Sequence, residues 1–216
     1  MKIQAHRLCK KFNSLTKEER EFTQGIILYH RQQHYMSQKH RKCLQPYSIE
    51  DSIQTFAAGT LSKHPYFIGN GAYSAVFNHP SDLNKVIKIQ ISQDDESARF
   101  YELACKLDDP NFIKVHAMDH CLGHNVFVLE RVQKLSPRHE EAIRECEHEE
   151  WRTAHRFDYL TDYCTHEDDV FGYCIRTALR VRNRICKYFK NFAVDLHPGN
   201  WGIRNDGTLV VLDPIC

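Results

Sequence analysis

The sequence lacks any run of about 20 apolar residues, the length that a helix needs to cross a bilayer. Its first segment is polar and basic and has no apolar stretch of the kind found in secretory signals. An excess of one charge is also missing, since the formal net charge is only +1. We therefore expect a cytosolic protein without a membrane partner. The charge balance gives no indication of a nucleic-acid partner, and we expect no direct contact with nucleic acid.

Paired cysteines are missing as well, although the chain has nine cysteines. No two of them lie two or three residues apart, and their number is odd. This pattern argues against a disulfide framework and favours a reducing compartment. Cys146 and His148, and likewise Cys164 and His166, could begin a zinc site. Neither pair has a second pair at the spacing of a zinc finger, so we expect no structural zinc.

Charged residues are unevenly distributed along the chain. Basic residues dominate from Met1 to Cys43, whereas the segment from Glu140 to Glu150 is acidic. Such blocks usually form solvated faces, and the alternative is that they dock onto a larger partner. The sequence does not decide between the two, and it does not indicate an oligomeric state.

With 216 residues, the chain has the size of one domain or of two small lobes that share a cleft. The first third of the chain has helical signals. Thr16 and Glu19 form a capping box, in which each side chain can bond the backbone N–H of the other. Apolar residues follow at helical spacing, which predicts a helix from about Thr16 to Met36. A second helix is predicted from about Ser48 to Ala58.

The remaining sequence alternates between strand and helix patterns. Three strands, a helix and two strands are followed by two long helices and a hairpin. The predicted strands are Tyr66–Ile68, Tyr73–Phe77, Lys85–Ile91, Ile113–Met118, Asn125–Val132, Trp201–Ile203 and Thr208–Leu212. The predicted helices run from Asp94 or Asp95 to Leu107, from Pro137 to Tyr159, and from Asp168 to Phe192.

A glycine-rich turn lies between the first two predicted strands. Glycines two residues apart let the backbone approach a polyphosphate, toward whose oxygens the amides can point. A dinucleotide-binding loop would be followed by a helix, whereas here β-type sequence continues on both sides, as in the glycine-rich hairpin of kinases. The predicted phosphate-binding residues are Gly69, Asn70, Gly71, Ala72, Tyr73, Ser74 and Val76.

Lys88 lies in the middle of an apolar strand pattern. A buried ammonium is costly unless it meets an anion. In a kinase that anion is the α/β-phosphate pair of ATP, and a carboxylate on the following helix orients the amine. The alternative is a lysine on the wet face of an edge strand. Glu96, Glu102 and Asp95 are all candidates for the carboxylate, and Glu96 is preferred from its distance ahead of the Pro110 turn.

A polar loop and a strand-terminal aspartate lie near the end of the sequence. Phosphoryl transfer needs a carboxylate near the acceptor hydroxyl and oxygen ligands for Mg²⁺. Asp195 is predicted to be the base or orienting group, and Asn200 and Asp213 are predicted to bind the metal. Each of these residues alone could belong to a solvated turn. The glycine-rich turn, the lysine in an apolar strand and this loop with its following aspartate, found in this order, favour a kinase site. The loop reads Asp195-Leu196-His197-Pro198-Gly199-Asn200, and the strand reads Val210-Val211-Leu212-Asp213.

At these residues the sequence resembles the protein-kinase-like superfamily. The loop from Asp195 to Asn200 looks like the D-x-H-x-x-N loop of atypical and small-molecule kinases, with His197 where conventional protein kinases carry lysine. A closer resemblance is to the early serine/threonine kinases of podoviruses that encode their own RNA polymerase. That resemblance rests on the stretches Gly69–Pro80, Val86–Lys88, Asp195–Asn200 and Asp213–Pro214.

The resemblance implies an α+β, minimal two-lobed kinase-like fold. Residues 1–60 would form a helical N-terminal extension, 61–132 the N-lobe and 133–216 a truncated helical C-lobe. ATP and Mg²⁺ would be the cofactors. Host proteins, including the transcription or translation machinery, would be the substrates in the cytosol of the infected bacterium. Lys88, Asp195 and His197 would be catalytic, and Glu130 would lie at the hinge that meets adenine.

The sequence departs from the kinase pattern after the metal aspartate. Pro214 and Ile215 replace the usual Phe-Gly, and no activation segment follows in this sequence. An ordinary peptide-binding platform is therefore not expected. A small-molecule phosphotransferase is one alternative, and a catalytically silent, nucleotide-binding inhibitor of a host protein is another. Retention of all the predicted catalytic and metal-binding residues favours an enzyme.

Overall fold

The computed structural model describes residues 13–40, 61–71, 74–90, 97–152, 170–189 and 194–214. The chain divides into two compact units. The first comprises Met1–Asp95 and Val115–Arg131, and the second comprises Glu96–Lys114 and Val132–Cys216. Residues 97–107, predicted from the sequence to belong to the same lobe as the five strands, belong to the second unit in this division. The predicted domain boundaries stay a prediction.

Helix α1 (Lys17–His40) opens the first unit. The Oγ1 of Thr16 accepts a hydrogen bond of 3.2 Å from the Glu19 N–H. In return, the Oε2 of Glu19 accepts one of 2.7 Å from the Thr16 N–H. The predicted capping box is therefore present, and the predicted helix is confirmed and extends to His40. The helix predicted over 48–58 lies outside the described residues.

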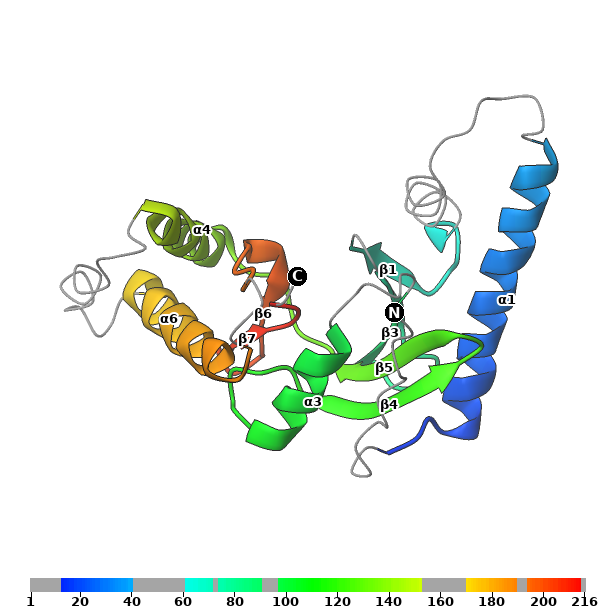
Figure 1. Cartoon of the computed structure of the whole chain (residues 1–216), viewed down its shortest axis with the longest axis horizontal. Coiled ribbons are helices and arrows are strands. Elements are labelled where there is room, and N and C mark those ends of the chain that lie inside the picture. The colour runs from blue at the N-terminus through cyan, green and yellow to red at the C-terminus, as the bar shows by residue number, and fades with distance from the viewer. Residues whose placement is uncertain are drawn as a thin grey trace. The chain divides into compact units, whose positions relative to one another are not determined.

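Five antiparallel strands form the sheet of the first unit, in the order β1-β2-β3-β5-β4. Figure 1 shows β4 and β5 as a hairpin. Its tight turn places both Leu122 and Gly123 at positive φ (48° and 88°), as the two central residues of a type I′ turn require. The predicted strands are confirmed, with shifts of a few residues at their ends. They are β1 (Phe67–Asn70), β2 (Ser74–Asn78), β3 (Lys85–Gln90), β4 (Val115–Cys121) and β5 (His124–Glu130).

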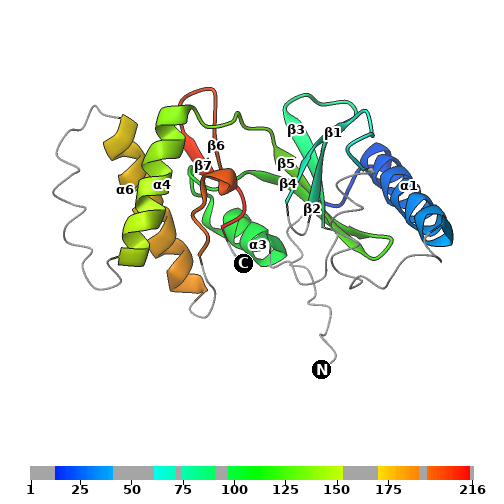
Figure 2. The same cartoon turned by 90° about the horizontal axis from the view of Figure 1, so that it is seen from above.

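Helix α1 packs on one face of this sheet (Figure 2). Ile26 and Ile27 are buried in one cluster with Phe77 of β2 and Ile87 of β3. Because side chains alternate between the two faces of a strand, the odd-numbered residues of β2 and β3 face α1. Helix α1 is thus part of the core of the first unit.

A buried hydrogen bond between side chains also ties α1 to the sheet. The Nε2 of His79, in the turn after β2, lies 2.9 Å from the Oε1 of Glu19. The Nδ1 of His79 accepts hydrogen bonds from the N–H groups of Ser81 (3.3 Å) and Asp82 (3.0 Å). Since Nδ1 is an acceptor, Nε2 carries the hydrogen and donates it to Glu19. Burial raises the pKa of Glu19, but hydrogen bonds from His79 and Thr16 outweigh it and hold that pKa below its usual value.

The second unit contains α3 (Ser97–Leu107), α4 (Pro137–Arg152) and α6 (Val170–Tyr188). It also contains a short 3₁₀ helix, η1 (Pro198–Asn200), and the hairpin of β6 (Trp201–Ile203) and β7 (Leu209–Val211). Helices α4 and α6 lie side by side in both views (Figures 1 and 2). The predicted helices and hairpin are confirmed. Several predicted helix ends lie outside the described residues: the start at Asp94 or Asp95, the end at Tyr159, the start at Asp168 and the end at Phe192. Within the described residues, α6 ends at Tyr188.

The order of elements confirms the predicted α+β, kinase-like fold class. Two bridges attach the hairpin of the second unit to other segments: Phe112 pairs with Val211, and Gln133 pairs with Ile203. No helix among the described residues combines the length and the apolar character needed to cross a bilayer.

Candidate active site

The glycine-rich turn joins β1 to β2. Gly69 and Asn70 end β1, and the N–H of Gly71 donates a hydrogen bond of 2.9 Å to the Ser74 carbonyl. Neither glycine is among the described glycines with positive φ. A Cβ on Gly69 would meet no heavy atom within 4 Å, and one on Gly71 would meet only the Ser74 Oγ, at 3.8 Å. Packing within the described residues therefore does not require glycine at either position.

Two predicted residues of this turn, Ala72 and Tyr73, lie outside the described residues. Ser74 and Val76 lie in β2, directly opposite Gln90 and Lys88 of β3. By alternation, these four side chains share the face of the sheet that points away from α1.

Lys88 occupies the centre of the sheet. It pairs with Val76 of β2 on one side and with Phe127 of β5 on the other, and it is only 4% exposed. The alternative of a lysine on the wet face of an edge strand is therefore wrong. An ammonium at such a position needs polar or anionic partners to offset its burial.

A row of polar side chains, Gln90, Asn125 and His120, lies next to Lys88 and was not predicted from the sequence. The Asn125 Nδ2 donates a hydrogen bond of 2.8 Å to the Gln90 Oε1, and the Asn125 Oδ1 lies 3.2 Å from the His120 Nδ1. Gln90 follows Lys88 by two residues and Asn125 precedes Phe127 by two, so all share one face. Strand alternation from Lys88 was the signal that could have found them.

The role of Glu130 at the adenine hinge and the carboxylate that pairs with Lys88 stay predictions. Glu130 ends β5 in register with Lys85, and the N–H of the next residue, Arg131, donates to the Asn84 carbonyl at 2.7 Å. Glu96 and Asp95 lie outside the described residues, while Glu102 is half-buried in α3.

Three predicted residues of the second unit are brought together by backbone pairing. The N–H of Asp195 donates to the Pro214 carbonyl at 2.8 Å, and the N–H of Leu212 donates to the Asn200 carbonyl at 2.7 Å. Asp213 lies between the two bonded residues of its own segment. Residues 195–200, which we call the aspartate loop, are thus held against Asp213 at both ends.

The aspartate loop is also bonded within itself. The Oδ1 of Asp195 accepts from the His197 N–H (3.0 Å), and the His197 Nδ1 accepts from the Gly199 N–H (3.0 Å). The Nδ2 of Asn200 donates to the Asp195 carbonyl at 3.2 Å. A Cβ on Gly199 would lie 3.1 Å from the His197 Nδ1, so a larger residue would press on that ring. The loop is a compact turn that precedes the buried strand β6.

The oxygen atoms of Asn200 and Asp213 suit a hard cation. The Asn200 amide nitrogen points to the Asp195 carbonyl, and no described residue donates a hydrogen bond to its Oδ1. Asp213 supplies a carboxylate next to the same loop. Mg²⁺ is usually held by one or two such oxygens together with substrate phosphates. Within the described ranges, no group of three His, Cys, Asp or Glu side chains could hold a metal by itself.

Ser97 was missed by the sequence predictions. Its Oγ donates a hydrogen bond of 2.8 Å to the Oδ1 of Asp213, and the serine is fully buried at the start of α3. A serine in the first turn of a helix is common, so the sequence alone contained no signal for this contact.

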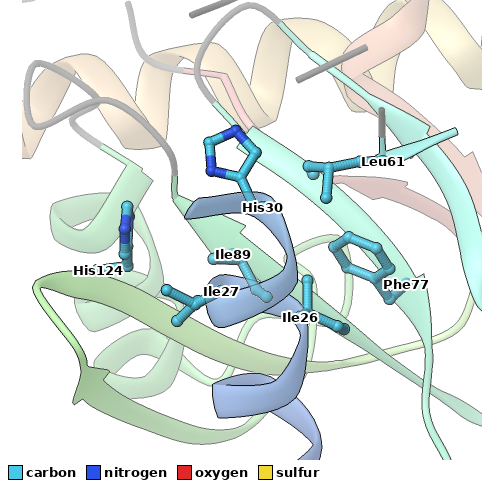
Figure 3. A pocket seen from close by; sticks show the side chains of 8 residues that line it. Ile26, Ile27, His30, Leu61, Phe77, Ile89 and His124 are labelled. Carbon is cyan, nitrogen blue, oxygen red and sulfur yellow. The ribbon is translucent and has the colours of Figure 1, made fainter. Parts of the chain in front are cut away.

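A mostly apolar pocket lies in the first unit on the side of α1, away from Lys88. Figure 3 shows Ile26, Ile27 and His30 of α1 beside Phe77 and Ile89 of the sheet. Burial lowers the pKa of His124, which also lines the pocket. The lining is mostly apolar, with His30 and His124 as its polar side chains.

The glycine turn and the buried strand lysine lie in the first unit, and the aspartate loop with Asp213 lies in the second. A family model described as "Bacteriophage T7 protein kinase 0.7" matches residues 21–216, and the chain belongs to this family. The chain is therefore a member of a protein kinase family. No curated protein matches the chain.

One similar solved structure is the PknI kinase domain of Mycobacterium tuberculosis, as a double mutant. It is 17% identical to this chain, with a TM-score of 0.37. The match covers 68% of this chain and 55% of that chain, so this chain spans about half the length of that kinase domain.

Proposed function

We propose that the protein is an ATP- and Mg²⁺-dependent serine/threonine kinase. The observation that carries the proposal is the backbone pairing of Asp195 with Pro214 and of Asn200 with Leu212. Because Asp195 and Asn200 pair with the residues on either side of Asp213, the pairing supports a role for all three in one site. A solvated turn has no need for such an arrangement.

The glycine turn and Lys88 would bind the nucleotide. Because nothing in the described packing requires glycine at 69 and 71, close approach of a phosphate is the reason we favour for these residues. Lys88 would neutralise phosphate charge from the centre of the sheet. Val76, on the same face, would contact the base of the nucleotide.

Asn200 and Asp213 would bind the metal through side-chain oxygens. When bound, Mg²⁺ would neutralise charge on the phosphate oxygens. Each residue is held from the backbone, Asn200 by Leu212 and Asp213 by its position between Leu212 and Pro214. Fixed oxygens of this kind need little rearrangement when a substrate binds.

Asp195 would accept the proton of the acceptor hydroxyl. The hydroxyl oxygen forms a bond to the γ-phosphorus of ATP, the bond to the β-phosphate oxygen breaks, and ADP leaves. The Oδ1 of Asp195 is oriented by the His197 N–H. The His197 ring accepts through Nδ1, so its Nε2 carries the hydrogen and could donate it to a phosphate oxygen.

The acceptors would be serine and threonine side chains of bacterial host proteins, including the transcription or translation machinery. Membership in a bacteriophage kinase family supports this choice. The enzyme would then act in the cytosol of the infected cell.

The test is transfer of label from γ-labelled ATP, with Mg²⁺, to the proteins of a bacterial lysate. We expect label with the wild type and its loss in Asp195→Ala and Lys88→Ala. Asp206→Ala is the matched control, because Asp206 is an exposed aspartate of the β6–β7 turn in the same unit as Asp195. This variant should keep full transfer.

Two other outcomes would contradict the proposal. Transfer of label to small molecules but not to proteins would favour a small-molecule phosphotransferase. ATP binding by folded protein without any transfer would favour the nucleotide-binding inhibitor.

A further inference from the structure

Ser97 contacts the candidate metal ligand Asp213 directly. Its Oγ donates to the Asp213 Oδ1 at 2.8 Å, and its own exposure is 0%. A hydroxyl has one hydrogen, and here that hydrogen goes to the carboxylate. Hydrogen bonds from a hydroxyl to an ionised carboxylate are among the stronger ones in proteins. The contact therefore limits how the Asp213 carboxylate can rotate.

The start of α3 is itself fixed to the segment that carries Asp213. The ring centroids of Phe100 in α3 and of Phe112 lie 5.5 Å apart, and both residues are buried. Phe112 pairs with Val211, two residues before Asp213, and the N–H of Ile113 donates to the Val211 carbonyl at 3.1 Å. The helix that contains Ser97 and the segment that contains Asp213 are thus both attached to Phe112 and Ile113 within the second unit, and these attachments support their contact.

We propose that Ser97 is a positioning residue that orients the Asp213 carboxylate for Mg²⁺. The inference rests on the proposed function, because it takes Asp213 to be a metal ligand. Partners that hydrogen-bond a metal ligand commonly change metal affinity about 10- to 100-fold when they are removed. Ser97 acts through Asp213 and has no contact with substrate in this role.

A structural role alone would make a different prediction from a positioning role. Loss of a buried hydroxyl in a merely structural site lowers stability and leaves metal affinity per folded molecule unchanged. A positioning role predicts weaker metal binding in protein that is fully folded. Metal affinity therefore separates the two roles.

The experiment measures binding of Mn²⁺, which also takes carboxylate and carbonyl oxygen ligands. Free Mn²⁺ is followed by electron paramagnetic resonance in the presence of a non-hydrolysable ATP analogue. For Ser97→Ala we expect the Mn²⁺ dissociation constant to rise about tenfold. Affinity for the analogue without metal should be unchanged. Ser97→Cys, which keeps a weak donor of similar shape, should fall between Ser97→Ala and the wild type.

Thr177→Val is the matched control. Thr177 is a buried hydroxyl residue of α6 in the same unit, and no described hydrogen bond joins it to the aspartate loop or to Asp213. Its Mn²⁺ affinity should equal that of the wild type. Thermal unfolding of each variant establishes that the compared proteins are folded, and Ser97→Cys carries the test if Ser97→Ala does not fold.

The failures of the two proposals are distinguishable. Wild type that binds the analogue but no Mn²⁺ would overturn the metal site and this inference with it. Wild type that binds Mn²⁺, with folded Ser97→Ala binding it equally well, would overturn the inference and leave the proposed function standing.

Discussion

The backbone N–H of Asp195 donates a hydrogen bond of 2.8 Å to the carbonyl oxygen of Pro214. This bond joins the first residue of the aspartate loop to the residue that directly follows Asp213. Conventional kinases have Phe-Gly after the aspartate that binds their metal, whereas this chain has Pro214 after Asp213. A proline has no N–H but keeps its carbonyl, so the substitution retains the acceptor for Asp195.

The pairing around Asp213 leads to a prediction for the metal site. Asp213→Asn keeps the shape of the side chain and an oxygen that can accept from Ser97, but it removes the negative charge. We expect phosphoryl transfer to fall by on the order of 100-fold or more, with little change in melting temperature. Transfer rates at saturating ATP, titrated over Mg²⁺ concentration, check this. An unchanged rate at every Mg²⁺ concentration would exclude Asp213 as a ligand.

Lys88 leads to a prediction for nucleotide binding. Lys88→Met removes the charge from the centre of the sheet while keeping most of the side-chain volume. Because a charged hydrogen bond contributes about 1.5–3 kcal/mol, we expect ATP affinity to fall roughly tenfold or more. Equilibrium binding of ATP is the measurement.

The matched control for Lys88→Met is Lys85→Met. Lys85 lies in the same strand, and its side chain points to the opposite face of the sheet from that of Lys88. The Nζ of Lys85 lies 3.0 Å from the Oδ2 of Asp82. ATP affinity of this variant should not change. Equal losses in the two variants would mean that the effect is one of general charge and that Lys88 has no special role.

The buried pair of Glu19 and His79 leads to a prediction for stability against pH. Since the folded pKa of Glu19 is lowered from its ordinary 4.5, its contribution is present above that value and is lost as pH falls through the folded pKa. Glu19→Gln should therefore cost about 1–3 kcal/mol of unfolding free energy at pH 7. Urea unfolding of both proteins at several pH values between 7 and 3 is the measurement. A cost that does not shrink as the pH falls would show that the charge of Glu19 contributes nothing.

Gly202 of β6 leads to a prediction for packing. A Cβ at this position would lie 2.3 Å from the Val132 Cγ2 and 3.1 Å from the Gln133 carbonyl oxygen. Gly202→Ala should therefore destabilise the protein by about 1–3 kcal/mol. Gly25→Ala is the control, because a Cβ there meets nothing within 4 Å and alanine favours a helix. In denaturant unfolding, the free energy of unfolding should fall for Gly202→Ala and rise for Gly25→Ala. No change in the free energy of unfolding of Gly202→Ala would mean that the Val132 side chain moves aside without cost.

Local patterns in the sequence predicted most elements correctly. The capping box at Thr16 and the apolar periodicity after it depend on neighbours in the chain, and so does the strand alternation around Lys88. Interactions between residues close in sequence are set by backbone geometry alone, so they can be read without a fold.

Contacts between distant segments could not be predicted in the same way. The helix that begins after Thr16 could equally have projected from the protein, and its place on the sheet depends on Ile26, Ile27 and the pair of Glu19 with His79. Likewise, Ser97 and Asp213 are 116 residues apart in the chain. No periodicity relates such positions.

The sequence by itself determined which chemical groups the protein has: the glycine turn, a lysine in an apolar strand, and the loop from Asp195 to Asn200 ahead of Asp213. Only the tertiary structure decided how they are held. Pairing of Asp195 with Pro214 and of Asn200 with Leu212 surrounds Asp213, and α3 brings a buried hydroxyl to its carboxylate. The physical reason is that backbone N–H and C=O groups must find partners when buried. Which partners they find depends on the packing of the whole unit.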